Sequence, residues 1–334
     1  MTVVDSAAAP GSGLTARDRG AAGDHLFRWV ALGAGLVVLA ILALIAISTT
    51  KEAWPAFRTM KLDFLTSDRW APSVADGQAP SFGARAFLYG TFVVSLISLV
   101  IAVPISLLIA LFVTEVAPQR LRGVITMLTD LLAAVPSVVW GLWGLAVLAP
   151  NIVGFYKGLH TVLGPIPLLG RLFGPNPSPN GTGFMTAGVI LAVMITPIIT
   201  SVMREVLLTV PRTDKDGALA LGATRWEMIR GVVVPHSLGG LVGAIMLGLG
   251  RAMGETIAVA LTIGAAIQIS PNLFAGGHAL PAVIALNWGD PGVPPGRSAL
   301  VACGVILFVI TIIVNYGARI VVRRAEIRMK GAAG

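Results

Sequence analysis

Two charged side chains stand one helical turn apart inside a long apolar stretch of the sequence. Arg251 and Glu255 lie in LGRAMGETIAVAL, within an apolar segment from Ser237 to Ile267 that is long enough to cross a bilayer. Placing an arginine at the centre of a bilayer costs about 2.5–3.5 kcal/mol on insertion scales. Residues four apart share one face of a helix, so the glutamate can pair with the arginine and offset part of that cost. Charges kept at this depth indicate either a structural ion pair or a path for a charged solute.

The order of the two residues favours a role in transport. Along a helix the more favourable order places the acid four residues before the base, and here the arginine comes first. A permeant anion must bind weakly enough to leave, and an arginine engaged by a carboxylate would offer such an exchangeable site. Gly248, Gly250 and Gly254 would let a helix or a pore come close to the backbone. We therefore predict that Arg251 and Glu255 line or gate a substrate path, and an internal salt bridge between helices is the alternative.

The composition is that of a membrane protein. Of the 334 residues, 55% are hydrophobic and 12% are charged, whereas a soluble domain carries about 25% charged residues. The net charge of +8 includes no basic run with interleaved aromatic residues, so we expect no nucleic-acid partner. The single cysteine cannot form an intramolecular disulfide, and the four histidines lack metal-ligand spacing. We expect no cofactor and no metal site.

Six stretches are apolar over enough residues to span a bilayer as helices. With both termini in the cytoplasm, the inner segments hold 15 of the 24 Lys and Arg residues and the outer segments hold 8, as the positive-inside rule requires. The first stretch exceeds the apolar length of a signal peptide, so we interpret it as a retained anchor. The spans are expected at Trp29–Ser48, Phe87–Val113, Ile125–Leu148, Phe184–Val202, Ser237–Ile267 and Ala299–Val322.

These spans divide the chain into two tails, an anchor and a core. We expect a disordered cytoplasmic tail over residues 1–24, the first span with an external segment over 25–86, the transmembrane core over 87–323 and a cytoplasmic tail over 324–334. Residues 149–183 are rich in Pro, Gly and Asn, and we expect turns there on the outer side.

Two further polar residues stand where spans bend or end. Ser137 follows Pro136, where we expect a kink inside the third span, and its hydroxyl is a candidate for the substrate path. A purely structural role at the kink is the alternative for this serine. Glu115 stands at the end of the second span, and we expect it to be a solvated boundary residue.

The one extended cytoplasmic segment between spans, residues 203–236, predicts a short helix at the membrane surface. Pro211 ends the preceding helix. Thr213 or Asp214 can then cap a helix that runs from about Lys215 to Leu221. Acidic residues at this point also suit the positive end of a helix.

The same segment predicts a glycine turn and a second helical stretch. Gly222 suits the left-handed position after a helix end, and residues 224–234 lead back towards the membrane. Ala218, Leu219 and Leu221 would be exposed on this projection and would suit insertion into the groove of a partner protein. An amphipathic turn on the lipid headgroups is the alternative that the residues alone leave open.

The spacing in this loop resembles the EAA loop of bacterial ABC-importer permeases. That pattern is E-A-A, three residues, G, nine residues and I-x-L-P, and every interval fits. Aspartate in place of glutamate keeps the acidic charge, and glycine in place of the first alanine would soften the helix by about 1 kcal/mol. The resemblance implies a coupling helix that docks on a cytoplasmic ATPase subunit. The matching residues are Asp216, Gly217, Ala218, Gly222, Val232, Val234 and Pro235.

Three other stretches resemble the permeases of bacterial phosphate importers, and the resemblance covers about residues 29–323. It implies a type I ABC-importer permease fold in the bacterial cell membrane, and it marks Arg251 and Glu255 as functional positions. It also implies a second permease subunit, a cytoplasmic ATPase dimer, an external phosphate-binding protein and surrounding membrane lipid as partners. The stretches are FGARAFLYGTFVVSLISLVIAVPISLLIALFVTEVAP (82–118), LLAAVPSVVWGLWGL (131–145) and GAIMLGLGRAMGETIAVAL (243–261).

We therefore predict a permease subunit of an ATP-driven importer of inorganic phosphate that works by alternating access. The sequence has no GxxxxGK[ST] phosphate-binding loop, so we expect no enzymatic activity in this chain and ATP hydrolysis in a partner. Sulfate or molybdate would suit a positively charged path as well. An ion-coupled secondary transporter with Glu255 as a proton relay would need inverted repeats, and a membrane enzyme would need a catalytic cluster; neither is evident.

Overall fold

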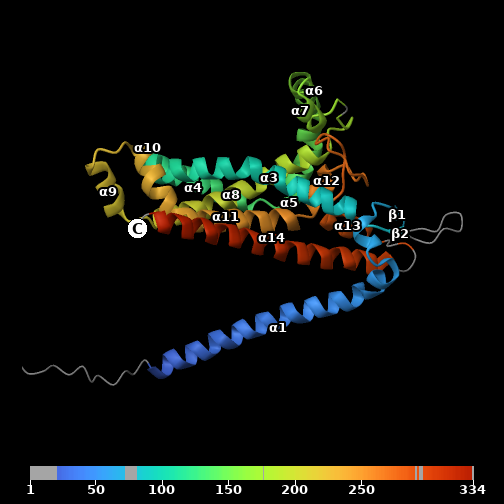
Figure 1. Cartoon of the computed structure of the whole chain (residues 1–334), viewed down its shortest axis with the longest axis horizontal. Coiled ribbons are helices and arrows are strands. Elements are labelled where there is room, and N and C mark those ends of the chain that lie inside the picture. The colour runs from blue at the N-terminus through green and yellow to red at the C-terminus, as the bar shows by residue number, and fades with distance from the viewer. Residues whose placement is uncertain (1–20, 72–80, 176, 290–291, 293–295, 333–334) are drawn as a thin grey trace, which may run out of the picture. The chain divides into compact units, whose positions relative to one another are not determined.

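Helices make up most of the chain (Figure 1). Within the described residues, six helices are long and apolar enough to cross a membrane, which confirms the prediction of an all-α protein with six transmembrane helices. The predicted orientation, with both termini in the cytoplasm, stays a prediction. The chain divides into two compact units, residues 1–48 and 49–334. The computed structural model describes residues 21–71, 81–175, 177–289, 292 and 296–332, and the side chains of 21, 22, 24 and 321–332 lie outside this description.

The first unit contains the start of helix α1 (Ala21–Met60). Apolar side chains cover this part of α1 on every side, and nearly all of them are exposed. A helix that is apolar all round suits a lipid environment. Residues 21–24, which we expected in a disordered tail, are helical, and residues 1–20 of that predicted tail lie outside the described residues.

Two long helices, α3 (Arg85–Leu111) and α8 (Phe184–Leu208), form the centre of the second unit. They approach closely, because a Cβ atom added at Gly188 of α8 would lie 2.4 Å from the Ile97 side chain of α3. The Ser106 hydroxyl of α3 donates a hydrogen bond to a backbone carbonyl oxygen of α8 at 3.1 Å. Buried polar groups in a membrane need such partners.

The core of the second unit follows one face of α8. Its buried apolar side chains recur every three or four residues, as an α-helix requires for one face. Helix α11 (Val234–Gly254) packs on α8, and α14 (Gly296–Ala332) packs on α11 and α13 (Leu280–Asn287) (Figure 1). The buried apolar residues of α8 include Phe184, Ala187, Leu191, Ile195, Ile199, Met203 and Leu207.

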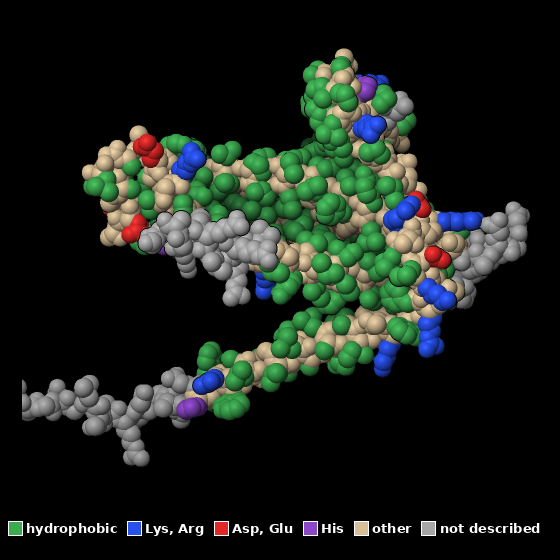
Figure 2. All heavy atoms as spheres, viewed as in Figure 1, with side chains coloured by type: hydrophobic (Ala, Val, Ile, Leu, Met, Phe, Trp, Pro, Cys, Tyr) green, Lys and Arg blue, Asp and Glu red, His purple; other side chains and the backbone are tan. Residues whose placement is uncertain are grey.

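A small aromatic cluster closes one end of the second unit. The antiparallel strands β1 (Trp70–Ala71) and β2 (Ser81–Phe82) follow the short helix α2 (Asp63–Thr66). The Trp70 ring lies 4.9 Å from the Phe82 ring and 5.1 Å from the Phe87 ring, both edge to face. Figure 2 shows apolar side chains over the middle of the visible face of this unit and most charged side chains near its two ends, as expected for a bundle that crosses lipid.

The third predicted span was wrong as a continuous helix over Ile125–Leu148. Helix α4 (Gln119–Ala134) ends at Val135, which has an extended backbone (φ −66°, ψ 125°). A proline makes the helical conformation unfavourable for the residue before it. Pro136 therefore separates two helices. A candidate span then runs over Ser137–Leu163.

Helical structure continues past the predicted end of this span. Part of residues 149–183, where we expected turns, is therefore helical. The elements in order are α5 (Ser137–Trp143), the π-helical turn η2 (Gly144–Leu148), α6 (Ala149–Leu163) and α7 (Pro167–Leu172).

Candidate functional site

The predicted charged pair lies where a transmembrane helix ends. Arg251 is in the last turn of α11, and Glu255 follows the helix with an extended backbone (φ −68°, ψ 126°). Helix α12 (Ile257–Thr262) starts two residues later. The prediction of one continuous helix over Ser237–Ile267 with Arg251 at its middle was therefore wrong. Non-helical backbone at membrane depth is tolerated where it lines a cavity or is buried in protein.

Glu255 is largely buried. Its side chain is 9% exposed, and its Oε1 accepts a hydrogen bond from the backbone N–H of Ala258 at 3.4 Å. Within the described part of the chain Arg251 and Glu255 form no ion pair with each other, so the expected pairing on one helical face was wrong. The break after Gly254 explains this result, because residues four apart share a face only while the helix continues.

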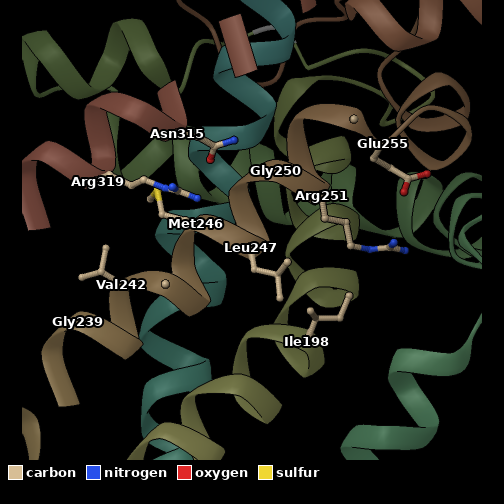
Figure 3. A pocket seen from close by; sticks show the side chains of 12 residues that line it. Ile198, Gly239, Val242, Met246, Leu247, Gly250, Arg251, Glu255, Asn315 and Arg319 are labelled. Carbon is tan, nitrogen blue, oxygen red and sulfur yellow. The ribbon is translucent and has the colours of Figure 1, made fainter. Parts of the chain in front are cut away.

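A cavity of about 1190 Å³ runs along one face of α11 (Figure 3). Its α11 residues recur every three or four positions, so they form a single stripe on that helix. Three glycines of the stripe are uncovered, because no atom lies within 4 Å of the place that a Cβ would take. In contrast, a Cβ added to Gly240 or Gly248 would collide with α8 at 2.4 or 2.5 Å. The uncovered glycines are Gly243, Gly250 and Gly254.

Two arginines from different helices line this cavity. Arg251 comes from α11 and Arg319 from α14, with Asn315 one turn before Arg319 (Figure 3). Both arginine side chains are exposed, and neither forms an ion pair in the part of the chain that the structure describes. A guanidinium carries five N–H donors and a carboxamide carries two. The cavity can therefore offer charge-assisted hydrogen bonds to an oxyanion.

The structure adds residues to the predicted site and leaves one out. Arg319 and Asn315 were not predicted, since Arg319 was counted with the cytoplasmic charges after the last span. Their spacing of four in an apolar helix was the available signal. Ser137 does not belong to the described residues that line the cavity; it begins α5, which packs against α12. Its place on a substrate path stays a prediction.

The projection predicted from residues 203–236 is present at one end of the second unit. Helix α9 (Arg212–Ala220) is followed by Gly222 at φ +90°, which confirms the short helix and its left-handed glycine. The predicted cap was wrong: Pro211 occupies the N-cap position, and Thr213 and Asp214 lie inside the first turn.

The second helical stretch of this projection is confirmed and leads directly into α11. Thr224 caps α10 (Arg225–Met228) through a capping box, in which Glu227 accepts hydrogen bonds from the Thr224 backbone N–H and hydroxyl. The π-helical turn η3 (Ile229–Val233) then joins α10 to α11. This cap gives the turn after Gly222 a defined geometry.

The residues of the predicted EAA-type loop divide by exposure. Ala218, which we expected to be exposed, packs partly against the core together with Val232 and Val234. Leu219 is 40% exposed and Leu221 is 92% exposed, as predicted. The exposed members of the loop are Asp216, Gly217, Gly222 and Pro235, with Trp226 beside them.

Glu115 is not a solvated boundary residue, so that expectation was wrong. It lies in the π-helical turn η1 (Phe112–Val116) at the end of α3, and its side chain is 8% exposed. The Lys215 Nζ of α9 donates a hydrogen bond to its Oε1 at 2.6 Å. The ion pair therefore joins the predicted coupling helix to a transmembrane helix.

Comparison with known proteins identifies the family of this chain. Residues 102–327 match the family described as binding-protein-dependent transport system inner membrane component. The phosphate transport system permease protein PstC of Mesorhizobium japonicum is 42% identical over 307 residues, which is 91% of each chain. The protein of the same name from Xylella fastidiosa (strain Temecula1) is 41% identical over 92% of each chain.

Two solved structures share the fold. A bacterial alginate ABC transporter in complex with its pentasaccharide-bound periplasmic protein has a TM-score of 0.55 at 14% identity, over 92% of this chain and 98% of that one. An inward-facing MetNI methionine ABC transporter has a TM-score of 0.52 at 20% identity, over 72% of this chain and 92% of that one. With the six transmembrane helices, these matches confirm the predicted ABC-importer permease fold and a multi-pass place in the membrane. The chain belongs to the binding-protein-dependent transport system inner membrane components, the permease subunits of ABC importers.

Proposed function

We propose that this chain is a permease subunit of an ATP-driven importer of inorganic phosphate. It forms one half of the translocation path, and a second permease subunit forms the other half. A cytoplasmic ATPase dimer hydrolyses ATP, and an external binding protein delivers phosphate. The names of the relatives support phosphate as the substrate.

The observation that carries this proposal is the uncovered cavity with Arg251 and Arg319. Among the described residues that line the cavity, two cationic side chains and one carboxylate, that of Glu255, give a positive balance, which suits a mono- or dianion. The uncovered glycine stripe on α11 gives a second helix or a solute access to the backbone. In this proposal the cavity is the half-path, and the second permease covers it from the open side.

The two arginines suit successive positions along the path. They come from helices that run in opposite directions in the bundle, and the cavity extends along α11 from Gly239 to Gly254. Exposed guanidinium groups bind an oxyanion more weakly than buried ones do, because water screens the charge. Phosphate can then pass between them without being trapped.

Reconstitution into proteoliposomes tests the proposal. The complex of this chain with its second permease and its ATPase is supplied with internal ATP, external binding protein and radiolabelled phosphate. We expect accumulation that requires ATP and that unlabelled phosphate suppresses better than sulfate or molybdate. Equal suppression by sulfate or molybdate would reassign the anion. Accumulation without ATP, driven by a proton gradient, would establish the secondary transporter instead.

A glycine substitution in the coupling loop separates backbone geometry from side-chain contacts. Gly222→Ala is expected to lower ATP-driven uptake several-fold, because φ is +90° there and the left-handed region costs alanine about 1–2 kcal/mol. An added methyl group would meet no atom within 4 Å, so crowding plays no part. The measurement is the initial uptake rate per assembled complex.

Gly217→Ala is the matched control for that substitution. Gly217 also has open space around it but lies inside α9, where alanine favours the helix by about 1 kcal/mol. We expect uptake at or above the wild-type rate for this variant. Equal losses for both variants would contradict a role for the left-handed turn.

A further inference from the structure

One ion pair in the described part of the chain connects the coupling projection to a transmembrane helix. Lys215 of α9 and Glu115 of η1 are 100 residues apart in sequence, and their charged atoms lie 2.6 Å apart. The side chains are 16% and 8% exposed. A pair shielded to this degree is screened much less by salt than a surface pair.

The two ends of this contact belong to different mechanical parts. α9 leads into α10 and η3, its main other neighbours, and its exposed face suits a partner protein. η1 continues α3 without a break, and α3 packs along α8 at the centre of the second unit. A push or pull on α9 therefore reaches the central helix pair through Glu115, independently of the chain connection through α10 and α11.

We propose that the Lys215–Glu115 ion pair transmits force from the ATPase-facing helix α9 to α3 during transport. Lys215 and Glu115 are positioning residues in this proposal, since they contact neither phosphate nor ATP. The proposal rests on the proposed ATP-driven import. An ion pair with a hydrogen bond suits this role, because it resists both separation and sliding, whereas an apolar contact slides easily.

Transmission of motion between two sites requires rigid elements that are joined by defined contacts. Removing one partner leaves the other charge shielded from water without compensation. That group then seeks water or a new partner, and α9 loses its fixed distance from α3. ATP hydrolysis can continue in the ATPase dimer, but less of its motion reaches α3 and α8.

Single neutral substitutions test the proposal in the complete complex. Glu115→Gln and Lys215→Met are each expected to lower the amount of phosphate transported per ATP hydrolysed by roughly 2- to 30-fold, the range that contacts on a coupling route produce. This ratio does not depend on how much complex assembles. A loss of structure alone would lower both activities together and leave the ratio unchanged, which would overturn the proposal.

Glu205→Gln is the matched control. Glu205 pairs with its neighbour Arg204 at 3.0 Å on the same helix, α8, and its side chain is 68% exposed. This pair joins no two elements, so the variant is expected to keep the wild-type ratio. A drop equal to that of Glu115→Gln would show a general effect of charge at this end of the chain and would contradict the proposal.

The reversed pair separates transmission from other roles of the two charges. Glu115→Lys combined with Lys215→Glu restores opposite charges across the same contact, and we expect it to recover most of the transport-to-hydrolysis ratio. No recovery beyond the single variants would overturn the proposal.

Cross-linking gives a second test that does not depend on charge. Glu115→Cys combined with Lys215→Cys, joined by a short bifunctional thiol reagent, would fix the same distance, and the native Cys303 is buried. We expect the cross-linked complex to keep ATP-driven uptake, because α9 and the end of α3 move as one body. Arrest by the cross-link and recovery on cleaving it would overturn the proposal. Failure of wild-type uptake itself would instead count against the proposed function.

Discussion

Replacing Arg251 by glutamine is expected to lower phosphate uptake by on the order of 10- to 100-fold while the complex still assembles. Arg251 is exposed in the cavity and forms no ion pair among the described residues, so its loss removes little from the fold. A hydrogen bond to a charged group contributes about 1.5–3 kcal/mol, and every 1.4 kcal/mol is about tenfold in an equilibrium. The measurement is the initial uptake rate, divided by the amount of complex in the membrane.

Two control variants sharpen this expectation. Arg251→Lys keeps the charge but loses the planar set of donors, so we expect an intermediate rate if phosphate contacts the guanidinium. Arg120→Gln removes an exposed arginine at the start of α4, outside the cavity, and we expect no change in uptake. Uptake at the wild-type rate in Arg251→Gln would contradict a substrate path at this cavity.

The role of Arg251 and Glu255 on a substrate path stays a prediction, and their predicted arrangement on one helical face was wrong. The rule that residues four apart share a face assumes an unbroken helix, and the apolar run from Ser237 to Ile267 gave no sign of the end at Gly254. An apolar composition indicates that a segment lies in lipid or in the protein interior. It does not indicate whether the backbone stays helical throughout the segment. The break became visible only with the neighbouring helices in place, since α12 packs against α5 and α8.

The shape of the segment over residues 203–236 was predicted far better, because local rules decide it. Gly222 adopts the left-handed conformation that its place after a helix predicts. The capping box of Thr224 and Glu227 was not predicted, although the spacing of these two residues was the available signal. The error there was also local: Pro211 took the cap position that Thr213 or Asp214 could have filled. Proline at the start of a helix needs no N–H, so it competes well for this place.

Contacts between distant parts of the chain account for what the sequence could not predict. Arg319 joins the cavity because α14 lies beside α11, and Glu115 is shielded because α9 returns to the end of α3. The residue pattern of one segment does not indicate which distant segment it will contact. A single charged residue at a helix end was therefore assigned to solvent, and the assembled bundle gives it a partner.

Replacing Leu221 by aspartate is expected to abolish co-purification of the ATPase and to reduce uptake to background. Leu221 is 92% exposed, so the substitution removes almost no contact within this chain. An apolar side chain this exposed at the tip of the projection suits a groove in the ATPase, and a carboxylate would have to lose its water there without a partner. The measurements are ATPase recovered per permease pair and the rate of ATP-driven uptake.

Control variants distinguish docking from a local effect on α9. An acidic group at a helix C-terminus opposes the helix dipole by about 0.3–1 kcal/mol, and Leu221→Asn avoids this charge while still removing the apolar contact. We expect the asparagine variant to weaken co-purification less than the aspartate variant does. Leu62→Asp places the same carboxylate on a 75% exposed leucine just before α2, beside the strands at the other end of the second unit, and should leave ATPase binding unchanged. If Leu221→Asp retained the ATPase at the wild-type level, the tip of α9 would lie outside the docking surface. The Lys215–Glu115 contact would then have no source of force at that end.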